Sequence, residues 1–223
     1  MPSAGLIIIC AVTDDGEGFS SIALNNLARV ANDAHGILVI GADEEVELPI
    51  EESEHVEILR YPKVRNRYRI LNLLFEKLGS RNEESTLWAL AETSVVNDEL
   101  DKVGVRDAAH MVETGIIDVA CANQRVWYYD RSNLEGSHPF MRFSGAMHPV
   151  EFGFGGFAIY DSRILKIVRF NTGSMYDFNK KARAIGARFA VVPWMVNSGY
   201  DRFYVALVIT CLLTFAALFV LLT

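Results

Sequence analysis

Cysteine is scarce in this sequence, and its few cysteines follow no functional pattern. Cys10, Cys121 and Cys211 lie far apart, without the spacing of metal ligands and without the even number that a disulfide framework requires. This usage favours a reducing compartment. About 200 residues precede an apolar C-terminal stretch, and a domain of that size buries a sufficient core without metals or disulfides.

Basic residues are also in the minority. The 21 Lys and Arg residues face 28 Asp and Glu residues, which gives a net charge of −7. A nucleic-acid-binding protein needs clustered positive charge to neutralise phosphate groups, so we expect no nucleic acid among the partners. Residues 60–69 form a basic stretch, for which local phosphate binding and a solvated helix face are both open interpretations.

A long uncharged apolar run occurs at the C-terminus. Residues 204–223 contain no charged residue, no proline and no glycine. As a helix they would be about 30 Å long, which matches the hydrocarbon core of a bilayer. A buried core helix would show more polar interruptions than the Thr and Cys found here. We therefore predict a single-pass C-terminal membrane anchor over 201–223. The N-terminus shows no signal peptide, so domain 1–200 is expected in the cytosol.

Strand-length apolar runs alternate with amphipathic segments in the region before this tail. Continuous apolar runs are typical of strands buried on both faces, and the strand–loop–helix–strand succession predicts an α/β domain. Its expected architecture is a mostly parallel, Rossmann-like central sheet with flanking helices. The predicted strands are 5–12, 36–40, 56–59, 86–91, 116–122, 152–159 and 189–193, and the predicted helices are 22–32, 63–78, 99–113, 161–169 and 177–186.

Polar or glycine-rich residues follow most of the predicted strands. In open parallel sheets, ligands bind beyond the carboxyl ends of the strands. Residues 123–149 are rich in aromatic residues, glycine and histidine, and a loop of that length is usually a binding element. The pattern therefore predicts a polar binding cleft at one edge of the sheet.

Four further segments occur in a characteristic order. They are 56–74 (VEILRYPKVRNRYRILNLL, with Arg65-Asn66 at a helix start), 117–134 (IDVACANQRVWYYDRSNL), 153–165 (GFGGFAIYDSRIL) and 177–197 (DFNKKARAIGARFAVVPWMVN). In this order they resemble nucleotide-diphospho-sugar glycosyltransferases of the A-type fold. More narrowly, they resemble the fungal capsule-type mannosyltransferase family and its viral and bacterial relatives. The resemblance implies transfer of a hexose, such as mannose, from a nucleotide-sugar donor to a glycan or lipid-linked acceptor near a membrane.

The resemblance also implies a metal. A-type transferases carry an Asp-x-Asp motif whose carboxylates hold Mg²⁺ or Mn²⁺ at the diphosphate. The matching place here reads Glu92-Thr93-Ser94, so Glu92 and Ser94 become the candidate metal ligands. An exposed loop acid without a ligand role is equally compatible with Glu92. Because one carboxylate is missing, a catalytically weak or inactive module that binds nucleotide sugars or glycans is the alternative function.

On the donor side, two residues are candidates for holding the nucleotide. Asp43 follows the second predicted strand, where a carboxylate accepts hydrogen bonds from a ribose or a uracil-like base; an ordinary turn residue is the alternative. Arg65 offers bidentate donors to a diphosphate.

On the sugar side, the family-like cluster contains Tyr129 and Asp130, an aromatic face for the sugar ring and a carboxylate for its hydroxyls. Buried tyrosine packing is the alternative interpretation. Gly155 and Gly156 allow close backbone approach to a sugar, or mark a bulge. Asp130 and Asp177 are the catalytic candidates, with Asp177 as an acid or orienting group, although it would serve equally as the N-cap of its own helix.

Overall fold

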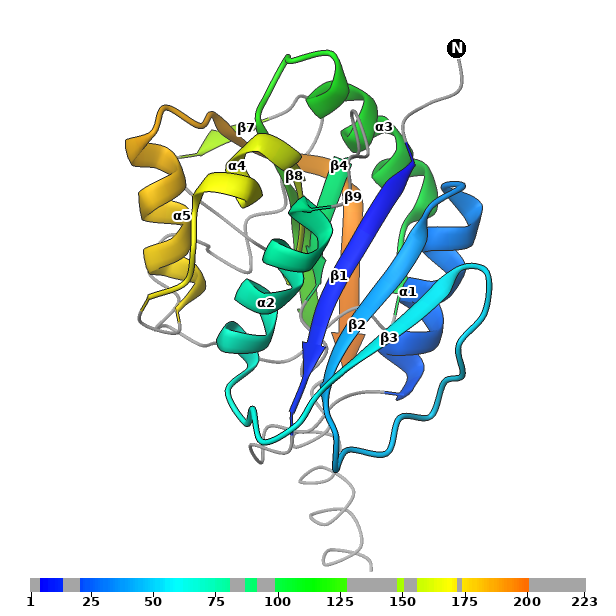
Figure 1. The fold of residues 1–223 in the computed structure, drawn as a ribbon. Helices are drawn as coiled ribbons and strands as arrows, with labels where there is room; N and C mark the ends of the chain where they lie inside the picture. Colours follow the sequence, from blue (N-terminus) through cyan, green and yellow to red (C-terminus); the bar gives the residue numbers. More distant parts are fainter. Residues whose placement is uncertain are drawn as a thin grey trace, which may run out of the picture.

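The computed structural model describes residues 5–13, 21–80, 87–91, 99–127, 148–150, 156–171 and 174–200. In this part of the chain, a central twisted sheet lies between two layers of helices (Figure 1). Helices α1 and α3 pack on one face of the sheet, and α2, α4 and α5 pack on the other. The α/β architecture that the sequence predicts is therefore confirmed.

Apart from the short strands β5 and β7, which the sequence did not predict, the described elements follow one another along the chain in the predicted order. The strands are β1 (Leu6–Val12), β2 (Ile37–Asp43), β3 (Val56–Tyr61), β4 (Leu87–Ala91), β5 (Glu99–Leu100), β6 (Val119–Trp127), β7 (His148–Val150), β8 (Phe157–Asp161) and β9 (Phe189–Tyr200). The helices are α1 (Ser21–Asp33), α2 (Arg67–Gly79), α3 (Lys102–Glu113), α4 (Ser162–Ile167) and α5 (Met175–Ala184).

The sheet is mixed but mostly parallel, as predicted. Its strand order is β3-β2-β1-β4-β8-β6-β9-β5, and β7 also pairs with β9. Strands β1 to β4 are parallel, and so is the pair β6 and β9. Strand β8 lies antiparallel between β4 and β6, while β5 and β7 are antiparallel to β9. The carboxyl ends of β1, β2, β3, β4, β6 and β9 therefore meet at one edge, which we call the carboxyl edge.

Side chains of each central strand alternate between two apolar layers. In β1, Ile8 and Cys10 face the layer formed with α1 and α3, whereas Ile7 and Ile9 face the layer formed with α2, α4 and α5. All four are almost completely buried, which explains why this strand appears in the sequence as an unbroken apolar run. Burial also raises the pKa of the Cys10 thiol to about 12.

Several predicted helix starts are wrong because a capping side chain, rather than the spacing of apolar residues, decides where the helix begins. Helix α2 begins at Arg67 rather than at 63, because the Asn66 side chain accepts from the backbone N–H of Arg69 and caps the helix. Asp101 caps α3 in the same way, so residues 99–100 form strand β5 instead of a helical turn. Asp161 caps α4 and ends β8.

The two strands β6 and β9 extend beyond their predicted ends. Strand β6 continues through residues 123–127, which the sequence assigned to a long loop, and β9 continues past Pro193 to Tyr200. They pair in parallel on both sides of a register shift, with Ala122 opposite Val192 and Asn123 opposite Val196. The bulge on β9 accommodates Pro193, which cannot donate a ladder hydrogen bond.

The predicted membrane anchor remains untested. Within the described ranges, no helix is both long and apolar enough to cross a membrane. Residues 204–223 lie outside those ranges, so the anchor stays a prediction.

Candidate functional site

The carboxyl edge carries every sequence-predicted site residue that the structure describes. Asp43 ends β2, Arg65 lies between β3 and α2, Gly156 precedes β8, and Asp177 lies in the first turn of α5. Helices α2 and α5 both run away from this edge toward the opposite one (Figure 1). The candidates outside the described residues are Glu92, Ser94, Tyr129, Asp130 and Gly155.

Asp43 is a buried carboxylate at the end of a parallel strand. The residue is 3% exposed. Strand alternation places Asp43 on the same face as Gly41, where an added Cβ would lie 2.3 Å from Cγ2 of Ile70 in α2. The carboxylate therefore lies on the face that α2 covers, at the level where that helix begins.

The chain turns sharply after Asp43. The backbone N–H of Val46 donates to the carbonyl oxygen of Asp43 at 3.3 Å, and the Val46 side chain is buried. Arg60 in the neighbouring strand β3 donates from Nη1 to the carbonyl oxygens of Asp43 and Val46, at 3.0 Å and 2.5 Å. Sequence reasoning placed Arg60 only in a general basic stretch. One signal was available in the sequence. Arg60 directly follows the predicted strand 56–59, and that strand is the next one along the chain after the strand that leads to Asp43.

Arg65 lies in the connection that leads into α2. Its guanidinium is 4.0 Å from the carboxylate of Glu45, and both side chains are about four-fifths exposed, at 79% and 80%. An ion pair this open is weak, so Arg65 is free to reorient toward a ligand. The helix start that the resemblance placed at Arg65-Asn66 is confirmed, since Asn66 is the N-cap of α2.

Asp177 does not cap its helix, which corrects one of the two interpretations that the sequence left open. Ser174 is the N-cap of α5, and its Oγ accepts from the backbone N–H groups of Tyr176 and Asp177 at 3.1 Å and 3.4 Å. Asp177 therefore lies in the first turn, where a negative charge is favoured by the helix dipole. The catalytic interpretation of Asp177 remains a prediction.

The first turns of α2 and α5 are joined by aromatic contacts. Phe170, in the connection between α4 and α5, stacks on Phe178 of α5 with ring centroids 4.3 Å apart and lies 4.9 Å from the ring of Tyr68 in α2. The Asn72 side chain donates to the carbonyl oxygen of Phe170 at 2.9 Å and accepts from its N–H at 3.0 Å. These contacts hold the two helix N-termini on the same side of the molecule.

Gly156 adopts a conformation that favours glycine. Its φ is 73°, and the residue is buried. Because β8 runs antiparallel to β4, Phe157 pairs with Ala91, the last residue of β4. Gly156 therefore lies beside the end of β4, after which Glu92 follows in the sequence.

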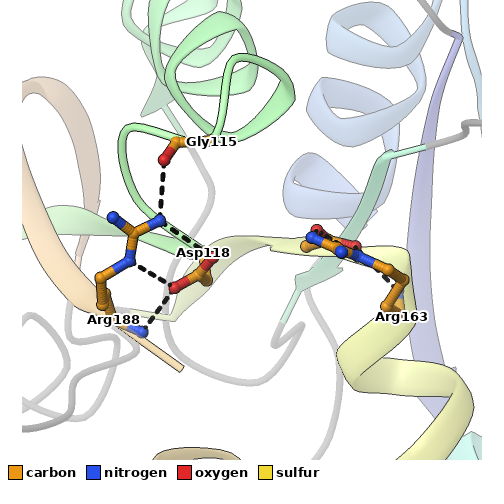
Figure 2. Close-up of polar contacts among 5 residues, drawn as sticks. Gly115, Asp118, Arg163 and Arg188 are labelled. Carbon is orange, nitrogen blue, oxygen red and sulfur yellow. Dashed lines mark hydrogen bonds and ion pairs between the residues drawn. The ribbon is translucent and has the colours of Figure 1, made fainter. Parts of the chain in front are cut away.

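The opposite edge carries a polar network that sequence reasoning missed. Asp118, just before β6, accepts from the backbone N–H of Arg188 at 2.9 Å and from its Nε at 2.8 Å, while Nη2 of Arg188 also donates to the carbonyl oxygen of Gly115 at 2.7 Å (Figure 2). The Arg188 guanidinium holds the pKa of Asp118 below its usual value. Asp161 and Arg163 form a second ion pair, in which the Arg163 side chain is exposed. The contacts of Arg188 join the starts of β6 and β9, and the backbone N–H of Asp161 at the end of β8 donates to the carbonyl oxygen of Asp118 at 2.9 Å.

Metal-ligating side chains do not gather in the described ranges. No group of three or more His, Cys, Asp or Glu side chains that could hold a metal ion occurs there. The predicted ligands Glu92 and Ser94 lie outside these ranges, so the metal site stays a prediction.

Comparison with known proteins identifies the fold class. The sequence matches no protein-family model and no curated protein. Among solved structures, residues 1–349 of S. aureus TarS in complex with UDP-GlcNAc match with a TM-score of 0.63 and 14% identity, over 88% of this chain and 58% of that one. GalNAc-T7 with UDP, GalNAc and Mn²⁺ matches with a TM-score of 0.60 and 8% identity, over 89% of this chain and 44% of that one.

The chain therefore has the A-type glycosyltransferase fold. It spans less than two thirds of the length of these neighbours. At such low identity the likeness defines the fold alone. The narrower resemblance to fungal capsule-type mannosyltransferases stays a prediction.

Proposed function

We propose that this chain is a glycosyltransferase that binds a nucleotide-diphospho-sugar at the carboxyl edge. The observation that carries the proposal is the position of Asp43, a largely buried residue that ends a parallel strand at the carboxyl edge. In open parallel sheets, ligands bind beyond the carboxyl ends of the strands, where a carboxylate accepts hydrogen bonds from donor groups of the ligand. The N–H and O–H groups of a nucleobase or ribose are such donors. The fold supports this interpretation, since TarS of the same fold was crystallised with UDP and with UDP-GlcNAc.

The diphosphate is assigned to Arg65 and to a divalent metal. The Arg65 guanidinium is exposed, and its ion pair with Glu45 is weak enough to be exchanged for phosphate oxygens. Glu92 and Ser94 offer a carboxylate and a hydroxyl oxygen, which fit Mn²⁺ or Mg²⁺ in ligand type. A metal bound there would neutralise the charge of the diphosphate leaving group. The structure of GalNAc-T7 contains Mn²⁺, which agrees with this assignment.

The sugar and the acceptor are assigned to the remaining candidates. A pocket for a hexose such as mannose would be shaped by Tyr129, Asp130, Gly155 and Gly156. The φ of 73° at Gly156 favours glycine, and the absence of a side chain lets the sugar come close to the backbone there. Asp177 would act as an acid or orienting group from the N-terminal turn of α5. A glycan or lipid-linked acceptor near a membrane fits the proposed apolar anchor over 201–223, with the domain in the cytosol.

Calorimetry with the purified protein tests donor binding. UDP, GDP and a panel of their sugars would be titrated with and without Mn²⁺, and one of them should bind saturably. Asp43→Asn removes the charge at nearly constant size and should weaken that binding about tenfold or more, as loss of charge-assisted hydrogen bonds does. Asp107→Asn, on the exposed surface of α3, is the matched control and should bind as the wild type. If no nucleotide or nucleotide sugar binds, the proposal is wrong.

A binding module without turnover is the second candidate function. It is favoured by the single carboxylate in Glu92-Thr93-Ser94, where related transferases place two. Such a module predicts a donor affinity that does not change with Mn²⁺, and neither hydrolysis nor transfer of the sugar. A transferase predicts that Mn²⁺ raises donor affinity and that Glu92→Ala removes this increase. Metal titration of the wild type and of Glu92→Ala separates the two functions.

A further inference from the structure

The turn after Asp43 is stabilised mainly by hydrogen bonds from a residue outside the turn. Its only internal backbone hydrogen bond in the described structure is the 3.3 Å contact from the N–H of Val46 to the carbonyl oxygen of Asp43, which is long for an N–H···O bond. Arg60 adds two shorter hydrogen bonds from one nitrogen, Nη1, to the carbonyl oxygens at both ends of the turn. We infer that Arg60 is a positioning residue that fixes the turn 43–46 and thereby the direction of the Asp43 carboxylate.

Arg60 acts through the backbone and not by contact with a ligand at that carboxylate. Val56 and Ile58 of β3 belong to the apolar layer on the α1 side of the sheet, and Arg60 continues this alternation. The Asp43 side chain belongs to the opposite face, the one covered by α2. The guanidinium therefore binds the carbonyl groups of the turn on the α1 face of the sheet, while the Asp43 carboxylate lies on the α2 face.

The local charge explains why an arginine is suited to this place. Residues 44–57 contain seven glutamates and no lysine or arginine. Mutual repulsion among these carboxylates favours opening of the segment, and Arg60 places a permanent cation at its start. A neutral side chain at this position would leave both the carbonyl groups and the acidic segment without this support.

This inference rests on the proposed function for the identity of the ligand, but its first test does not need a ligand. Amide hydrogen exchange of the free protein reports how often the turn opens. In Arg60→Met, which keeps the length of the apolar stem, the Val46 amide should exchange about tenfold faster than in the wild type, the change expected from losing the arginine hydrogen bonds. Arg60→Lys keeps a donor cation and should restore much of the protection. Arg106→Met, on the exposed surface of α3, is the matched control.

The second test links the turn to the site. Titration with UDP and with uridine should show both affinities reduced by the same factor of about five to ten in Arg60→Met, because the lost contact concerns the nucleoside part. Arg65→Met should reduce UDP affinity but leave uridine affinity unchanged, since Arg65 is assigned to the diphosphate. A purely global effect of Arg60→Met would instead speed exchange throughout the sheet.

The outcomes are separable. Unchanged Val46 exchange in Arg60→Met overturns the positioning role, whatever binds. Faster Val46 exchange with no binding of any nucleotide by the wild type upholds the positioning role and overturns the proposed function. Faster exchange with unchanged UDP and uridine affinities shows that Asp43 does not bind the nucleoside and overturns the link between the turn and the ligand.

Discussion

Gly104 in α3 gives the sharpest test of how this helix packs on β9. A Cβ added there would lie 2.3 Å from the carbonyl oxygen of Trp194, 2.5 Å from Cα of Met195 and 2.7 Å from its nitrogen. A comfortable contact is about 3.5 Å, so Gly104→Ala forces the helix and the bulged strand apart by about 1 Å. All three atoms are backbone and cannot rotate away.

Two opposing contributions set the size of the effect. Overpacking against a rigid backbone costs about 3 kcal/mol, the upper end of the usual range. Replacing glycine by alanine in a helix returns about 1 kcal/mol. We therefore expect a net destabilisation of about 2 kcal/mol, which lowers the melting temperature by about 4–8 °C in a domain of this size.

Urea denaturation followed by circular dichroism measures this difference directly. Gly79→Ala is the matched control, because a Cβ at this last residue of α2 would meet only Cγ of Lys166, at 4.0 Å. It should change stability by less than about 1 kcal/mol. If Gly104→Ala is as stable as the wild type, α3 does not approach the β9 bulge this closely, and the reasoning is refuted.

Three further predictions concern the rest of the fold. Asn72→Ala should destabilise the protein by about 1–3 kcal/mol in urea denaturation, because it leaves the partly buried backbone N–H and carbonyl groups of Phe170 unpaired; an unchanged midpoint would contradict this. Asp118→Asn should cost about 1 kcal/mol at pH 7. Arg188 lowers the pKa of Asp118 in the folded protein. The extra stability of the wild type over Asp118→Asn is therefore fully present above the ordinary carboxyl pKa, and it should disappear as the pH falls through the lowered pKa of Asp118. Cys10 and Cys121, both buried with raised pKa values, should react with a thiol reagent only after unfolding in a Cys211→Ser background; labelling of the native protein would argue against their burial.

The sequence predicted the sheet well because apolar runs report burial on both faces. In β1 and β2, alternate residues serve two helical layers, so no polar side chain interrupts the strands until Asp43. The same logic located the carboxyl edge, since the first polar residue after such a run marks the end of the buried strand. The position of Asp43 could therefore be predicted, although what surrounds its carboxylate could not.

The errors arose where a few hydrogen bonds decide a boundary. Ser174 and not Asp177 caps α5, and both residues are acceptable caps by type. Residues 99–100 pair with β9, and this long-range pairing has no local signal. The role of Arg60 likewise depends on two carbonyl groups fourteen and seventeen residues earlier in the chain. Such contacts follow from tertiary structure, which apolar periodicity does not encode.

The two sides of the candidate site depend on different supports. Asp43 depends on its turn and on Arg60, which act locally at the edge strand β3. The helix starts next to Arg65 and Asp177 are instead joined through Phe170, which contacts the first turns of both α2 and α5. If the proposed function holds, loss of Arg60 should therefore disturb nucleoside binding alone. A change that loosens Phe170 should disturb the diphosphate side and the acceptor side together, because one aromatic ring braces both helices.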